Sequence, residues 1–238
     1  MSRIILIETS TALCSTALIE GDEIIYKEST EPRAQAALTA PFIKEMLDEK
    51  GIKASDLDAV CVSKGPGSYT GLRVGVSSAK GLCFGAGLPL IAINTLDTLV
   101  WQALDEGLIP EGCSTVVPMI DARRMEVYSA VYRVSDGAVT RLSEIAPVIV
   151  DKDSYAAELE AGKVLFIGDG AMKCKDVIAC DNPINAGNAT FAEAFPKASS
   201  MVKPALAAFD AKNFEDVAYF EPFYLKQFVA TVSKKNLF

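Results

Sequence analysis

The sequence predicts an α/β fold in which two lobes face each other across a cleft. Both halves of the chain show the same order of expected elements, β-β-β-α-β-α, and each half has a glycine turn between a strand and a helix. The 238 residues, half of them hydrophobic, suffice to bury the cores of two small lobes. We expect the lobes to comprise residues 1–108 and 109–238, with the last segment packing back on the first lobe.

The elements of the first half follow from hydrophobic spacing and turn residues. Leu38, Phe42 and Met46 lie four residues apart and predict one apolar stripe of a helix. Pro41 indicates that this helix starts near Leu38 or kinks there, and Thr95 is expected to cap a later helix. The expected strands are residues 3–8, 14–19, 23–27, 59–63 and 88–93, and the expected helices are residues 38–51, 70–85 and 95–104.

The second half repeats the order of elements without repeating the sequence. Gly168-Asp169-Gly170 is a second glycine turn that opens a helix. A helix-rich segment is expected over residues 191–209, and an aromatic segment follows over residues 219–228. The other expected elements are strands at residues 114–121, 125–134, 138–150 and 163–167, and a helix at residues 151–159.

The most distinctive stretch is the junction over residues 63–75, where three glycines fall within seven positions. Pro66 fixes φ inside the turn, and Ser68 or Thr70 can cap the helix that follows. The stretch is either an anion cradle or a tight turn that packs a helix closely on its strand. It has neither the Walker nor the dinucleotide-binding spacing, which favours the tight turn.

Gly71, Gly75 and Ser78 follow one another at spacings of four and three within the helix that begins at this junction. One face of that helix therefore carries almost no side chain. Such a face suits close approach by another helix.

Composition excludes several classes of function. The net charge of −8 and the pI of about 4.7 argue against nucleic-acid binding as the main activity. The chain has no histidine, which excludes Ser-His-Asp and Cys-His hydrolysis and histidine metal sites. Its six cysteines form no C-x-x-C pair and are expected to be reduced core thiols. No apolar run approaches the length of a membrane span, so we expect a cytoplasmic protein without a membrane partner.

The tandem order of elements is the architecture of sugar kinases, actin and Hsp70, the actin-like ATPase fold. There the first hairpin turn carries an aspartate and a glycine beside hydroxyls, and grips phosphate with magnesium. Here that turn is Glu8-Thr9-Ser10-Thr11, without glycine. Its hydroxyls could donate to a phosphate and Glu8 could hold magnesium through water, or the turn is a plain hairpin, which we favour.

Two segments of the second half are also candidate site residues. The position of Gly168-Asp169-Gly170 commonly lies near the adenosine of a nucleotide in this architecture. Asp121 and Arg123 stand at the end of a strand, where they either face the cleft or form a surface ion-pair cluster.

Taken together, these segments resemble the TsaB (YeaZ) family, the bacterial accessory subunits for threonylcarbamoyladenosine formation on tRNA. The family usually has aspartate in place of Glu8, and often a histidine where this chain reads Ala34-Gln35-Ala36-Ala37. The matching segments are residues 7–11, 65–75, 94–97 and 120–128, and Tyr224-Leu225-Lys226.

The resemblance implies an inactive homologue of TsaD, the catalytic subunit, which uses histidines to hold a metal. Such a subunit would bind TsaD through its first-lobe helices and support modification of adenosine 37, contacting tRNA only indirectly through the complex. A small ATPase subunit, TsaE, usually joins, and the isolated chain would tend to form a homodimer. The expected partner interface is Leu38, Phe42, Met46, Gly71, Val74, Gly75, Ser78 and Leu82.

No cofactor is expected to be required, although weak ATP or ADP binding is compatible with the fold. The rival hypothesis is a nucleotide-dependent ATPase or phosphotransferase; a peptidase has little support without histidine. The vestigial nucleotide site would be Glu8, Thr9, Ser10, Thr11, Gly168, Asp169 and Gly170. The residues expected to shape the loops are Gly65, Pro66, Gly67, Ser68, Arg73, Asp121 and Arg123.

Overall fold

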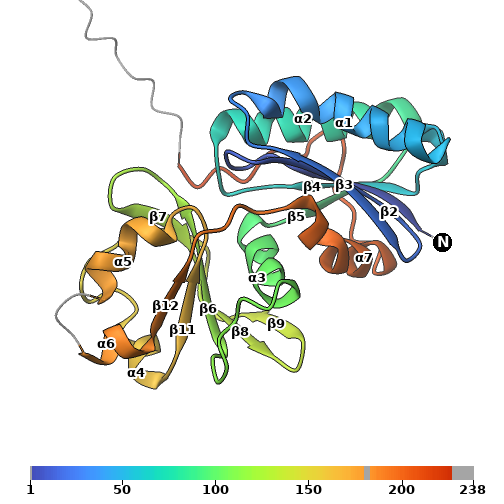
Figure 1. Cartoon of the computed structure of the whole chain (residues 1–238). Helices are drawn as coiled ribbons and strands as arrows, with labels where there is room; N and C mark the ends of the chain where they lie inside the picture. Colours follow the sequence, from blue (N-terminus) through green and yellow to red (C-terminus); the bar gives the residue numbers. More distant parts are fainter. Residues whose placement is uncertain (1, 180–182, 227–238) are drawn as a thin grey trace, which may run out of the picture.

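Two lobes, each built on a mixed β-sheet, make up the protein (Figure 1). The structure is a computed structural model and describes residues 2–179 and 183–226. The strand order of the first sheet is β3-β2-β1-β4-β5, and the second sheet has the matching order β10-β7-β6-β11-β12, with β8 and β9 added beside β6. In both sheets the central strand is antiparallel to one neighbour and parallel to the other. This agreement confirms the predicted two-lobed α/β architecture.

The first half contains all of its predicted elements. Its strands are β1 (Arg3–Glu8), β2 (Cys14–Glu20), β3 (Glu23–Ser29), β4 (Ala59–Ser63) and β5 (Leu90–Ile93). Its helices are α1 (Ala34–Lys50), the short 3-10 helix η1 (Ala54–Asp56), α2 (Tyr69–Ala86) and α3 (Thr95–Asp105).

The second half follows the same order with shorter elements. Its strands are β6 (Thr115–Asp121), β7 (Glu126–Ser129), β8 (Tyr132–Ser135), β9 (Ala138–Arg141), β10 (Ala146–Ile149), β11 (Val164–Ile167) and β12 (Ala189–Ala192). Its helices are α4 (Ala156–Ala161), α5 (Ala171–Ala179), α6 (Pro183–Asn188), the 3-10 helix η2 (Ala198–Met201) and α7 (Val202–Asp210).

Two helix starts differ from the prediction. Helix α1 begins at Ala34 and contains Pro41, because Gln35 in its first turn donates to the carbonyl oxygens of Thr11 and Ala12 and so fixes that turn. Helix α3 is capped by Asn94, whose Oδ1 accepts the N–H of Leu96 at 3.0 Å. The hydroxyl of Thr95 instead bonds to Ser63.

The long strand predicted over residues 125–134 is divided into β7 and β8. Both strands keep one register along β6, since Met119 pairs with Ser129 and Val116 with Tyr132. The interruption lies opposite Pro118, which has no N–H to donate to a ladder. The strand predicted over residues 138–150 divides correspondingly, with β9 pairing with β8 and β10 with β7.

Each half of the chain contributes a helix to the other lobe. Helices α1 and α2 cover one face of the first sheet, and η2 and α7, from the end of the chain, cover the other (Figure 1). Helix α3 packs Leu96, Leu99 and Val100 against β6 and β11 of the second sheet. The boundary expected at residue 108 assigns α3 to the first lobe, although the helix packs into the core of the second lobe.

Free thiols occupy the core, as the cysteine pattern predicts. Cys14, Cys61, Cys83 and Cys174 are buried and Cys113 is half-buried. Cys180, together with residues 227 and 228 of the expected aromatic segment, lies outside the described residues. Within residues 2–179 and 183–226, no helix combines the length and apolar character that a membrane span requires.

Candidate functional site

The glycines of the junction allow α2 to begin directly against the β1–β2 turn. A Cβ added at Gly67 would collide with the Ser10 carbonyl oxygen, and one at Gly71 or Gly75 with Thr9. The N–H of Ser68 donates to the Ser10 carbonyl oxygen at 2.6 Å, and Thr9 Oγ1 donates to the Gly71 carbonyl oxygen at 2.8 Å. This geometry supports the tight-turn interpretation of the glycine stretch, with Ser68 as the N-cap.

Glu8 is the last residue of β1, directly before the first hairpin turn, and has no exposed surface. Its Oε1 accepts the N–H of Ser10 at 2.7 Å, and its Oε2 has no hydrogen-bond partner within the described part of the chain. Burial raises the pKa of this carboxyl group from its ordinary value of 4.5 to about 7. A carboxyl group enclosed in this way does not fit the magnesium and phosphate that the fold family implies for the turn.

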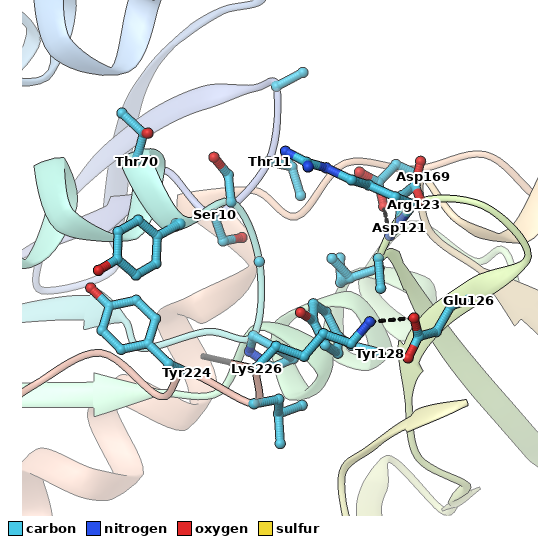
Figure 2. A pocket seen from close by; sticks show the side chains of 18 of the residues that line it. Ser10, Thr11, Thr70, Asp121, Arg123, Glu126, Tyr128, Asp169, Tyr224 and Lys226 are labelled. Carbon is cyan, nitrogen blue, oxygen red and sulfur yellow. Dashed lines mark hydrogen bonds and ion pairs between the residues drawn. The ribbon is translucent and has the colours of Figure 1, made fainter. Parts of the chain in front are cut away.

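A cleft of about 880 Å³ separates the two lobes (Figure 2). Ser10, Thr11, the loop over residues 66–68 and the start of α2 line it from the first lobe, and the β6–β7 turn lines it from the second. Figure 2 shows the Arg123 side chain extending from the second lobe toward Thr11. Ser10 Oγ and Thr11 Oγ1 are buried and have no hydrogen-bond partner among the described residues.

The β6–β7 turn presents Arg123 and Arg124 with positive φ angles of 72° and 50°. Lys173 holds this turn, because its Nζ donates to Asp121 Oδ1 at 2.6 Å and to the carbonyl oxygens of Arg124 and Glu126. Asp121 Oδ1 also accepts the N–H of Arg123 at 2.6 Å. Asp121 therefore shapes the turn, while the two exposed arginines face solvent beside the cleft.

The second glycine turn brings α5 close to β6. Gly168 has a φ of 131°, and a Cβ there would collide with the Met119 carbonyl oxygen. Between the glycines, Asp169 lines the cleft and accepts the N–H of Asp121 at 2.9 Å. Burial raises the pKa of the Asp169 carboxyl group to about 6. As in the first lobe, the glycines of this turn serve close packing.

Three residues of the expected partner interface do not face solvent. Met46, on the inner face of α1, is completely buried in the core of the first lobe. Gly71 and Gly75 face Thr9 of the same chain. The Gly71–Gly75 part of the small-residue face is therefore covered by the β1–β2 turn, and the prediction is wrong for Met46, Gly71 and Gly75.

An open groove of about 570 Å³ does lie between α1 and α2. Ser78 and Leu82, both predicted interface residues, line it from α2, while Leu38, Phe42 and Val74 are half-buried beyond it. The prediction missed the other residues that line the groove from the two helices, which are Ala40, Ile43, Lys44, Leu47 and Asp48 on α1 and Gly81 on α2.

Arg73 packs against Tyr69, one turn earlier on α2, and Tyr69 lines the cleft. Its guanidinium carbon is 4.2 Å from the centre of the Tyr69 ring, and its Nη2 donates to the Tyr69 hydroxyl at 2.5 Å. The Tyr69 ring in turn packs on Tyr224 near the end of the described chain, with ring centres 4.7 Å apart. Arg73 thus orders an aromatic pair that joins α2 to the C-terminal segment.

Comparison with known proteins identifies the family. The family model described as TsaD, tRNA N6-adenosine threonylcarbamoyltransferase, matches residues 31–235. The TsaB protein of Bacillus subtilis is 32% identical over 183 residues, which are 74% of each chain. The chain belongs to the TsaB (YeaZ) family. Escherichia coli TsaB, named a tRNA threonylcarbamoyladenosine biosynthesis protein, is 28% identical over 229 residues and 96% of each chain.

A solved member of the same family supports the fold. YeaZ from Pseudomonas aeruginosa matches with a TM-score of 0.80 at 26% identity, covering 94% of this chain and 100% of that one. Both the family and the two-lobed α/β fold predicted from the sequence are therefore confirmed.

Proposed function

We propose that the protein is a non-catalytic accessory subunit of the complex that forms N6-threonylcarbamoyladenosine at position 37 of tRNA. In this role it binds the catalytic TsaD subunit and supports the transfer. Membership of the TsaB family supports a role in tRNA threonylcarbamoyladenosine biosynthesis. The match to the TsaD family model supports homology with the catalytic subunit. The sequence has no histidine with which to hold a metal as TsaD does, and this supports a non-catalytic role.

The α1–α2 groove is the observation that carries the docking proposal. Ala40, Ile43 and Leu47 form its apolar wall, and Leu82 faces them from α2. On the same helix, Phe84 has 88% of its surface exposed. Apolar surface of this kind marks interaction sites, and a groove between two helices accepts an amphipathic helix from a partner.

The remaining partners are proposed from the family resemblance and from the charge of the surface. A surface with a net charge of −8 favours contact with tRNA through the complex instead of directly. The ATPase subunit TsaE joins the complex, and in the absence of TsaD the groove supports self-association into a dimer. The protein needs no cofactor of its own and works in the cytoplasm.

The docking proposal is tested by Gly81→Arg. Gly81 lines the groove, and a Cβ there meets no atom within 4 Å, so the variant fills the groove without disturbing the fold. We expect its affinity for TsaD, measured by calorimetry, to fall at least about tenfold. Gly187→Arg makes the same change at an equally open position on α6 and should bind TsaD normally. Unchanged binding by Gly81→Arg would exclude the groove as the docking site.

A nucleotide-dependent ATPase or phosphotransferase is the second candidate. It is favoured by the size of the cleft, by the buried hydroxyls of Ser10 and Thr11 beside it, and by the Arg123 side chain, which extends toward Thr11. Titration with ATP and magnesium separates the two candidates. Micromolar binding with turnover would establish the enzyme, whereas weak binding without turnover is expected of the accessory subunit.

A further inference from the structure

Residues 214–226, here called the C-terminal strap, run from α7 across the first lobe to the second. The N–H of Glu215 donates to the Leu90 carbonyl oxygen at 2.8 Å, which joins the strap to the edge of the first sheet. Further along, the N–H of Phe223 donates to the Lys64 carbonyl oxygen at 2.7 Å. Backbone hydrogen bonds thus attach both the start and the later part of the strap to the first lobe.

Side chains strengthen this attachment. Val217 and Phe220 pack against the core between α2 and the first sheet. The Lys80 amine on α2 donates to the carbonyl oxygens of Ala218 and Phe220 at 3.1 and 3.0 Å. The strap up to residue 223 is therefore a fixed part of the first lobe.

The end of the strap makes a different kind of contact. Lys226 forms an ion pair with Glu126 at the start of β7, and its amine lies 5.9 Å from the centre of the Tyr128 ring (Figure 2). The side chains of Lys226 and Glu126 are 40% and 22% exposed. Tyr224, Leu225 and Lys226 also line the cleft, so the strap forms part of its wall.

The lobes are joined more firmly away from the cleft. Helix α3 packs directly against η2, which covers the first sheet, and the ion pairs Lys197–Glu106 and Lys203–Asp105 lie beside this contact. Helix α3 itself is packed into the second lobe. At the cleft, by contrast, the strap reaches the second lobe through a partly exposed ion pair, which is weak and screened by salt.

We propose that the Lys226–Glu126 pair holds the cleft closed and that its rupture lets the lobes separate. The strap then stays attached to the first lobe by its hydrogen bonds, its apolar contacts and the Tyr224–Tyr69 ring contact, and Lys226 leaves the second lobe. Salt, or a charged partner that competes for either member of the pair, opens the cleft. This inference is independent of the proposed function, because it requires neither TsaD nor nucleotide.

Charge reversal tests the proposal. Lys226→Glu and Glu126→Lys each replace attraction by repulsion, whereas the double variant restores an ion pair of opposite orientation. We measure the radius of gyration by small-angle X-ray scattering, and hydrogen exchange of the turns at residues 10–12 and 122–124. Lys175→Glu makes the same charge change at an exposed site on α5 outside the pair and serves as the control.

We expect each single reversal to increase the radius of gyration and to raise the hydrogen-exchange rate at both turns about fivefold. This is the change in the opening equilibrium that the loss of one exposed ion pair produces. The double variant should return both values toward those of the unaltered protein, which should itself open as salt is added. If single reversals leave both measurements at the control values, or if the double variant stays open, the proposal is wrong. Thermal melts establish that every variant is folded.

Discussion

Glu8 places a carboxyl group inside the first lobe where water does not reach it. Burial is the main cause of its raised pKa, and hydrogen bonding from Ser10 offsets this only in part. The folded protein therefore favours the neutral carboxyl group, while the unfolded chain ionises it near the ordinary value of 4.5. Folding and proton binding are linked at this residue.

The linkage predicts that stability falls as the pH rises. A raised pKa in the folded state stabilises the protein fully below about pH 4.5, and this contribution is lost as the pH rises to about 7. The shift corresponds to about 3 kcal/mol. Asp169, with a pKa of about 6, adds an effect of the same sign.

Glu8→Gln keeps an acceptor for the Ser10 N–H and cannot ionise. We expect urea unfolding at pH 5 and pH 8 to show a much smaller stability difference in this variant than in the unaltered protein. Glu31→Gln, at an exposed position, should leave the difference unchanged. A Glu8→Gln variant with the full pH dependence would show that another group causes it.

At the scale of elements, the packing of α2 on the β1–β2 turn makes a second prediction. Gly71→Ala directs a methyl group into the Thr9 carbonyl oxygen, which belongs to the backbone and cannot rotate away. We expect a loss of about 3 kcal/mol in the free energy of unfolding, measured with denaturant. Gly81→Ala on the same helix meets no atom within 4 Å and should stabilise by up to about 1 kcal/mol. Equal stability of the two variants would contradict the close packing.

Local spacing predicted most elements, but not which face of α1 is buried. Apolar residues surround much of this helix, so Leu38, Phe42 and Met46 form as regular a stripe as Ile43, Met46 and Leu47. The sheet selects the second set. Periodicity alone cannot choose between two apolar stripes that overlap on one helix.

The candidate site shows a related limit. The glycine spacing in α2 predicted close approach by another helix, but the segment that approaches is the β1–β2 turn, and nothing local showed this. Lys173 and Lys226 also escaped prediction, because their partners lie 52 and 100 residues away in sequence. Contacts of this range leave no pattern in spacing.

At the scale of the whole molecule, the exchange of helices between the halves predicts that neither half folds alone. A fragment of residues 1–108 lacks Met201 and Ala205, which cover Ile4 and Leu6 on the first sheet. We expect this fragment to show no cooperative thermal unfolding by circular dichroism, and to gain it when residues 109–238 are co-expressed. Cooperative unfolding of the fragment by itself would show that α7 is dispensable for the first lobe.

The position of α7 also bears on how the protein emerges from the ribosome. All five strands of the first sheet are translated by Ile93, more than one hundred residues before the helix that covers their second face. Nascent chains fold from the N-terminus as domains become available. One apolar face of this sheet instead stays uncovered through most of translation. The growing chain is therefore a substrate for chaperones that bind exposed apolar strands.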